Sequence, residues 1–529
     1  MGDRKRVSSV ARLRWQPALA SGAFLLLPAV SFLLPAAALA AQPCQSCHPK
    51  EVAAYSHSSM AHSLRRPGKE PEGTFTTASG TRFTIRSNNN GTWQRMERLG
   101  GSVEYQVAYV IGSGSHASGY LIQAGDHLFQ SPICYYPSRH RYDLAPGYEQ
   151  TSEPGFTRPV GEECVLCHSG RPQHVPGTAN RYKQPIFLEE AISCERCHGP
   201  SEEHLKRPLP GSIINPAKLA PAARDSVCEQ CHLTGVTQRI LNPGRDFADF
   251  HPGQRLEEVF TVYTRSGARA FKVVSHSEQL ALSACARNSQ GKMWCGTCHD
   301  PHAQTAPTAQ TYNERCETCH RGKLAESHPA QTNCIGCHMT RRPAQDGGHT
   351  VFTDHRITKR PEPDAAIPAT DELTAWREPN DALQTRNLAL AYLNAGLYGH
   401  SAAQVMRGYQ MLTALRSAED DVDVLRGMGH ALLLTRQPVE ALKAFERALQ
   451  LTPGSAASEA DLGTAYLQAG QMEKAASHLE RAMQLDPLLI SAGTTLEDVY
   501  RRQGNDGKAD ALVDRMRRAM LNMSKDTRH

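Results

Sequence analysis

The stretch Cys194-Glu195-Arg196-Cys197-His198 is one of seven Cys-x-x-Cys-His motifs in this chain of 529 residues. Cysteines at i and i+3 share one face of a helical turn, and the histidine that follows leaves the same turn. Two thiols and an imidazole in this arrangement suit the two vinyl groups and the iron of one haem, so each motif predicts a covalently attached c-type haem. The seven motifs are Cys44-Cys47-His48, Cys164-Cys167-His168, Cys194-Cys197-His198, Cys228-Cys231-His232, Cys295-Cys298-His299, Cys316-Cys319-His320 and Cys334-Cys337-His338.

Other uses of paired cysteines fit this chain less well. Zinc sites and thioredoxin-like redox pairs also contain Cys-x-x-Cys, but neither requires a histidine directly after the second cysteine. A redox pair is also not repeated seven times. The motifs use fourteen of the sixteen cysteines. The other two, Cys134 and Cys285, could form a disulfide or stay as thiols, and the sequence leaves both alternatives open.

Residues 1–40 predict a signal peptide. Basic residues precede an apolar stretch at 20–39 that Pro28 and Pro35 interrupt, and Ala38-Leu39-Ala40 matches a small-x-small cleavage site. An uncleaved N-terminal anchor is the alternative, and no other stretch is apolar enough to span a bilayer. We therefore expect a mature chain that begins near Ala41, is exported to a bacterial periplasm and has no transmembrane span.

The charge of the chain gives no reason to expect nucleic-acid binding. The formal net charge is +5 at pH 7, and the signal peptide removes five basic residues and Asp3, which leaves about +1. Each attached haem adds two propionates, so we expect an acidic holoprotein. The sequence pI of about 8.4 is therefore misleading. A basic stripe with interleaved aromatic residues, which would favour nucleic acid, is also missing from the sequence.

The 115 residues between the first and second motifs predict β-structure. Apolar residues alternate at 103–111, which predicts one half-buried strand there, and Phe83 and Ile85 alternate in the same way. Asn88-Asn89-Asn90-Gly91 predicts a hairpin turn. We therefore expect an antiparallel meander within about residues 73–150.

The haem region as a whole is too short for ordinary apolar cores. Seven haems share the 320 residues from Ala41 to Arg360, which cannot give each haem a core of its own. We expect short helices at the motifs, long loops and a core built from stacked macrocycles. The expected fold class is α+β: a multihaem cytochrome c domain at 41–360 with the β-meander insert, followed by an all-α solenoid.

The C-terminal part repeats with a period of 34 residues. A Pro-containing linker at 361–375 leads into residues 376–529, which contain no cysteine. One copy runs from about 488 to 521, and an earlier one is visible at 388–396. This period and its small residues predict four helix pairs of tetratricopeptide type, with a generic helical bundle as the alternative. The recurring positions are Gly429, Ala441, Ala448 and Pro453, followed by Gly463, Ala475, Ala482 and Pro487.

The histidines outside the motifs are numerous enough to provide a second ligand for every iron. Thirteen lie between Ala41 and Arg360, so bis-histidine ligation throughout is possible. His204 and His302 stand closest to motifs, and Met60 is an alternative ligand near the first one. We interpret His127, His140 and His251 as bystanders. The distal candidates are His57, His62, His116, His174, His204, His276, His302, His328, His349 and His355.

Four segments carry a resemblance to a known class: His57-Ser58-Ser59-Met60, 194–204, 295–302 and Phe352-Thr353-Asp354-His355. With them the chain resembles bacterial multihaem c-type cytochromes related to the tetrahaem partner of hydroxylamine oxidoreductase, fused to tetratricopeptide repeats. The resemblance implies electron transfer through close-packed, mostly bis-histidine haems. Related nitrite reductases carry a lysine in place of one motif histidine, whereas every motif here ends in His.

These observations predict a periplasmic heptahaem cytochrome that transfers electrons between a donor and an acceptor redox protein. We expect the repeats to dock a protein partner, and we predict no catalytic residue. One alternative is an oxidoreductase that converts a small nitrogen or sulfur compound at one open haem. Another is a structural cytochrome that self-associates into larger assemblies.

Overall fold

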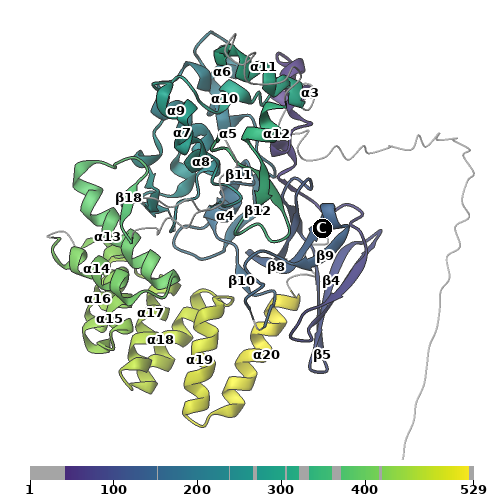
Figure 1. The fold of residues 1–529 in the computed structure, drawn as a ribbon. Coiled ribbons are helices and arrows are strands. Elements are labelled where there is room, and N and C mark those ends of the chain that lie inside the picture. Colours follow the sequence, from purple (N-terminus) through teal and green to yellow (C-terminus); the bar gives the residue numbers. More distant parts are fainter. Residues whose placement is uncertain are drawn as a thin grey trace, which may run out of the picture. The chain divides into compact units, whose positions relative to one another are not determined.

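The computed structural model describes residues 42–151, 153–237, 239–265, 271–303, 307–320, 333–359, 371–415 and 420–522. The expected signal peptide, most of the expected linker and His328 lie outside these ranges. The described residues combine helices and sheets, and paired helices make up the C-terminal part (Figure 1). Within them, no helix has both the length and the apolar character needed to cross a membrane.

A four-stranded antiparallel meander confirms the expected β-structure after the first motif. Its hairpin turn lies where the sequence predicts it: Asn88 pairs with Gly91, and the Asn90 backbone N–H donates to Asn88 Oδ1 at 2.8 Å. Gly91 has a φ of +127°, a conformation that side chains rarely adopt. The strands are β2 (Gly73–Thr76), β3 (Arg82–Asn88), β4 (Gly91–Arg98) and β5 (Gly101–Gln106).

A second antiparallel sheet follows, and it corrects one prediction. Residues 103–111 do not form one strand, because the chain changes sheets after Gln106. The Val107 N–H donates to Thr92 O in the first sheet, and the next N–H, of Ala108, donates to Leu121 O in the second. The second sheet has the order β1-β6-β7-β8-β10, with β9 also paired to β8. Its strands are β1 (Leu64–Arg65), β6 (Tyr109–Ile111), β7 (Ser118–Ala124), β8 (His127–Tyr136), β9 (Arg141–Leu144) and β10 (Arg158–Pro159).

Short helices hold the motifs, as predicted, and short strand pairs connect them. The helices are α2 (Gln42–Gln45), α3 (Pro49–Tyr55), α4 (Glu162–Leu166), α5 (Glu195–His198), α6 (Glu202–Lys206), α7 (Pro221–His232), α8 (His276–Leu282), α9 (Ala284–Asn288), α10 (Cys295–Cys298), α11 (Ala309–His320) and α12 (Cys334–His338). The strand pairs are β11 (Arg171–His174) with β12 (Tyr182–Glu189), β13 (Ile240–Leu241) with β14 (Phe260–Thr261), β15 (Tyr263–Arg265) with β18 (Leu373–Ala375), and β16 (Arg341–Pro343) with β17 (Val351–Thr353).

One apolar cluster ties the second sheet to the second motif. Leu121 and Leu128 of the sheet pack with Val165 of α4 and with Phe187 of β12, and each of these side chains is buried. Burial of apolar area at this boundary contributes about 25 cal/mol per Å². The sheet is therefore a scaffold that fixes where α4 presents its cysteines.

Eight helices form the four pairs expected in the C-terminal part. Each of the first three pairs begins with a capped helix, because Asn380, Asp421 and Ser455 accept backbone N–H groups of the first turn. The helices are α13 (Asp381–Tyr398), α14 (Ala402–Thr413), α15 (Val422–Leu434), α16 (Pro438–Leu451), α17 (Ala456–Gln468), α18 (Met472–Leu485), α19 (Ile490–Arg502) and α20 (Asp506–Asn522).

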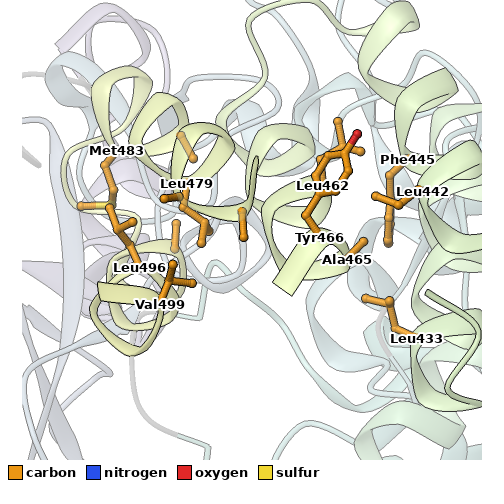
Figure 2. Packing of buried hydrophobic residues seen from close by; sticks show 14 of the residues in the cluster. Leu433, Leu442, Phe445, Leu462, Ala465, Tyr466, Leu479, Met483, Leu496 and Val499 are labelled. Atoms are coloured by element: carbon orange, nitrogen blue, oxygen red, sulfur yellow. The ribbon is translucent and has the colours of Figure 1, made fainter. Parts of the chain in front are cut away.

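Small residues set the spacing inside the pairs. A Cβ on Gly429 would lie 2.4 Å from a ring carbon of Phe445, and a Cβ on Gly463 would lie 2.5 Å from Cγ of Leu479. Both glycine and partner recur after 34 residues, so the same close approach is built twice. Figure 2 shows Phe445, Leu479 and Leu496 in the continuous core that results. The close packing at these glycines explains why small residues recur every 34 residues in the sequence.

The repeats are packed against the rest of the chain at both ends. At the first pair, Arg386 Nη1 donates to Leu241 O at 2.7 Å, and Asn387 Nδ2 donates to Asn242 Oδ1 at 3.0 Å. The last three residues of the expected linker are β18, which is paired in a sheet. At the other end, Leu488 and Met520 join the core of the two sheets. The repeats and the motif region are therefore one packed unit.

A buried polar contact accompanies the second of these junctions. His127 Nε2 lies 2.8 Å from Asp486 Oδ1, and the two side chains are 3% and 2% exposed. Arg181 Nη1 donates to Leu485 O at 3.3 Å, and its Nη2 pairs with Asp126. The sequence does not predict His127 to be an iron ligand. In the structure it connects the first residue of β8 to the C-terminal end of α18.

Candidate haem-binding sites

The first, third and fifth motifs each close a single helical turn, which brings their cysteines to one side. In the first motif the His48 N–H donates to Cys44 O at 2.8 Å, and in the third the His198 N–H donates to Cys194 O at 2.9 Å. The fifth repeats this bond, from His299 to Cys295 at 2.9 Å. This i+4 to i bond gives the cysteine spacing that two thioether bonds to one macrocycle require.

Three motif histidines face a second histidine ring at a nearly constant separation. The ring centres are 6.4 Å apart for His48 and His204, with planes inclined by 22°. His198 and His302 are 5.9 Å apart at 34°. Two imidazoles on opposite sides of one metal ion, each bonded at about 2 Å through a ring nitrogen, have ring centres about 6 Å apart. The separation within each pair therefore fits two histidines that bind the same iron ion.

The fifth motif is similar, with His299 and His355 6.1 Å apart at 30°. The fourth motif differs, because His232 and His276 are 5.0 Å apart at 81°, with their Nδ1 atoms 3.3 Å apart. The ring of His276 also lies 4.8 Å from that of His355. Burial, together with its histidine neighbours, lowers the pKa of His276 to about 3. His276 is therefore neutral at pH 7, and the neutral imidazole is the form that binds metal ions.

Carbonyl oxygens orient several of these rings. Nδ1 of His198 lies 2.8 Å from Ile214 O, Nδ1 of His355 lies 3.0 Å from Thr353 O, and Nδ1 of His338 lies 2.7 Å from Thr358 O. A ring that donates from Nδ1 to a carbonyl keeps its lone pair on Nε2, which is the arrangement of metal-bound histidines. His204 makes the equivalent contact to Ser212 Oγ at 2.7 Å.

Other candidates have less favourable surroundings. His349 Nε2 lies 2.9 Å from Asp143 Oδ2, so the nitrogen that would bind iron is already engaged. His116 packs its ring on Phe352 at 4.6 Å. His57 and His62 are exposed on the segment after the first motif, and His62 Nδ1 lies 2.9 Å from Ser58 O. His328 lies outside the described residues.

His174 stands apart because neither of its ring nitrogens has a hydrogen-bond partner among the described residues. It lies at the end of β11, 3.8 Å from Glu162 of α4, with its ring against Tyr182. Burial raises the pKa of Glu162 to about 7, and Asp246 adds to this effect. Burial lowers the pKa of His174, which favours a neutral imidazole with a free lone pair.

The fold brings motifs together in pairs that the sequence order does not reveal. Burial raises the pKa of the Cys194 thiol and the nearby Cys44 thiol adds to this effect, while the Cys167 thiol lies close enough to Cys231 to raise the pKa of that buried group. The same holds for Cys228 with Cys295 and for Cys316 with Cys334. The first motif therefore adjoins the third, the second adjoins the fourth, the fourth adjoins the fifth, and the sixth adjoins the seventh.

The two cysteines outside the motifs are free thiols. Cys134 is buried in the second sheet, and burial raises its pKa to about 12. Cys285 is partly exposed on α9. The alternative of a disulfide, left open by the sequence, is therefore not present in this structure.

One charged group inside a motif was not found by sequence reasoning. Glu229 lies between Cys228 and Cys231, with its side chain 6% exposed. Its Oε1 accepts a hydrogen bond from Trp376 Nε1 at 3.1 Å, and its Oε2 pairs with Arg377 Nη1 at 2.6 Å. Burial raises the pKa of Glu229, and Arg377 opposes that rise. Because 147 residues separate the partners Trp376 and Glu229, no local pattern could reveal this contact.

Comparisons with known proteins agree with the motifs. A family model described as cytochrome c554 and c-prime matches residues 147–199, which contain the second and third motifs. The multiheme cytochrome MtrA of Shewanella baltica (strain OS185) is 25% identical over 213 residues, covering 34% of this chain and 60% of that protein. The chain thus spans less than two thirds of that relative's length. These similarities imply covalently bound c-type haem.

The repeats are similar to a second group of proteins. A tetratricopeptide repeat model matches residues 432–488. A crystal structure of MamA is 19% identical with a TM-score of 0.23, over 28% of this chain and 82% of that one. MamA 41-end from Desulfovibrio magneticus RS-1 is 20% identical with a TM-score of 0.23, over 28% and 79%. The segment that matches the repeat model begins in α15 and includes α16, α17 and α18.

Proposed function

We propose that this chain is an exported electron-transfer cytochrome with seven covalently attached haems, one at each motif. The observation that carries the proposal is the set of three imidazole pairs with nearly equal separations, each made of a motif histidine and a second histidine. Their separations of 5.9–6.4 Å would allow the two histidines of each pair to bind one haem iron between them.

In this proposal the motif cysteines hold the macrocycles, and the motif histidines are the proximal ligands. His204 would serve the first motif, His302 the third and His355 the fifth. The bound haem supplies one-electron exchange at iron. The carbonyl contacts of His198 and His355 engage Nδ1 and leave Nε2 available to bind iron, and burial favours the neutral form of these imidazoles.

The arrangement of the motifs supports transfer between haems. Thiols of neighbouring motifs lie close enough to influence one another electrostatically, so macrocycles attached to them would be neighbours as well. In this way the second, fourth and fifth motifs follow one another, and the first adjoins the third. A kinship to the tetrahaem partner of hydroxylamine oxidoreductase belongs to this proposal and is supported by the match at 147–199.

The domain limits and the location also belong to the proposal. We place the signal peptide at 1–40, the haem domain at 41–360 and the repeats at 376–529, with a periplasmic mature protein. The repeats dock a protein partner, and a donor and an acceptor redox protein exchange electrons with the haems. Repeats of this type commonly present an extended surface to a partner.

Two measurements on the purified mature protein test the proposal. Intact mass spectrometry should give a mass that corresponds to seven haems and a start near Ala41. Low-temperature EPR should show low-spin ferric signals only. A mass with six or fewer haems after full maturation would refute the count. A large high-spin signal that nitrite or hydroxylamine removes would favour an enzyme with one open haem.

A further inference from the structure

The segment that leads into the repeats reaches directly into the fourth motif. Leu373 of β18 donates its backbone N–H to the hydroxyl of Tyr392 on α13, at 3.1 Å. Three residues later, the Trp376 N–H donates to Val262 O at 2.8 Å. The side chain of Trp376 then donates to the carboxylate of Glu229. A short, fully bonded path therefore connects the first repeat helix to the loop between two haem-binding cysteines.

The Glu229 carboxylate is buried between the two cysteines of the fourth motif, so its charge acts directly on a haem attached there. It is almost fully buried, and only the guanidinium of Arg377 forms an ion pair with it among the described residues. Asp225, the other acidic group that raises its pKa, adds negative charge nearby. A charge in the protein interior acts over several ångströms with little screening. An unpaired carboxylate beside a haem stabilises ferric iron over ferrous iron, and an unpaired guanidinium does the reverse.

We infer that Arg377 and Trp376 are positioning residues for the haem of the fourth motif. They balance the charge of Glu229 from the segment directly before the first repeat helix, and they thereby set the reduction potential of that haem. The inference rests on the proposed attachment of haem at Cys228 and Cys231. It gives the first repeat a physical connection to one particular iron. A displacement of α13 would change the pairing of Glu229 and, with it, the potential.

The test compares three variants of the full-length holoprotein: Glu229→Gln, Arg377→Gln and the double variant. Potentiometric titration followed by EPR is run at about pH 7 and again at about pH 9, because burial raises the pKa of Glu229 and the loss of Arg377 removes a group that opposes this rise. Glu229→Gln should raise the potential of one haem, and Arg377→Gln should lower it. The double variant should return close to the wild-type value, because both charges are gone.

Controls separate this effect from general damage. Arg426 and Asp461 form a similar pair at 2.6 Å within the repeats, so Arg426→Gln should leave all potentials unchanged. Trp376→Phe keeps the ring but removes the N–H, and it should lower the same potential by a smaller amount than Arg377→Gln. If Arg377→Gln does not yield a protein with attached haem, the lowered potential of Trp376→Phe still tests the charge-balancing role.

The outcomes distinguish the inference from the proposed function. A mass that lacks one haem in the wild-type protein, with Cys228 and Cys231 unmodified, would refute attachment at the fourth motif. Seven haems with shifts of the same sign in both single variants, or with no shift, would overturn the charge-balancing role alone. A purely structural role would also leave the double variant further from wild type than either single one.

Discussion

The junction between His127 and Asp486 offers a direct test of how the repeats are held. Replacing Asp486 with Ala removes the buried partner of His127 and also the acceptor of the Leu488 N–H, which lies 3.1 Å from Asp486 Oδ1. Loss of one partner from a buried pair typically destabilises a protein by about 3–5 kcal/mol. Because His127 keeps Asp126 at 2.7 Å, we expect about 2–3 kcal/mol for Asp486→Ala.

The repeats themselves provide a matched control. His478 Nδ1 lies 2.7 Å from Glu459 Oε2, but these side chains are 30% and 13% exposed. Since solvent screens a more exposed pair, Glu459→Ala should cost about 1 kcal/mol or less. Urea unfolding, followed by the circular dichroism signal of the helices, measures both losses of stability. The slope of the unfolding free energy against urea concentration should be the same in each variant and in the wild type, so that the two losses can be compared.

A double-mutant cycle completes the experiment. His127→Ala combined with Asp486→Ala should show a coupling of about 1–3 kcal/mol, as expected for residues in contact. Equal losses for Asp486→Ala and Glu459→Ala, or additive losses in the cycle, would refute the view that this buried contact fastens the repeats to the sheet.

Three further predictions follow from the same structure. His204→Ala and His302→Ala should each keep all seven haems by mass and convert one haem to high spin by EPR, because thioether bonds do not depend on the distal ligand; unchanged spectra would contradict the ligand assignment. Gly463→Ala should lower stability by about 1–3 kcal/mol in thermal unfolding, because its Cβ would meet the leucine opposite at 2.5 Å. Gly507→Ala, which meets nothing within 4 Å, should be neutral or slightly stabilising. Removing residues 371–529 should leave an unstable, aggregating fragment, because it uncovers the core of the sheets; a monomeric fragment with a wild-type melting temperature would contradict this.

Local patterns were sufficient to predict several parts of the fold. The hairpin at Asn88–Gly91 depends on four consecutive residues, and the recurrence of Gly429 as Gly463 depends on a fixed period. Such signals are contained in short stretches of chain, so a single sequence displays them. The one strand predicted at 103–111 was wrong because alternation continues across the point where the chain changes sheets. Only the partners of Val107 and Ala108 distinguish the two sheets.

The candidate sites show the same division. Each motif lies within five consecutive residues and is visible in the sequence, whereas the pairing of His204 with His48 depends on how distant segments fold together. His349 shows the limit of ranking by position along the chain. Its place after the last motif made it a candidate, but its Nε2 is turned to Asp143. The orientation of a ring is decided by tertiary contacts that no single sequence reveals.

Attachment at both ends has an evolutionary consequence for the repeats. A solenoid with a free end can gain or lose a unit by duplication or deletion, since each unit contacts only its neighbours. Here Arg386 and Asn387 bond one end, and Asp486 and Leu488 bond the other. An inserted unit would carry the second set of contacts away from the sheet. The number of repeats is therefore fixed by the span between the two attachments, and we expect relatives that keep both attachments to keep the same number.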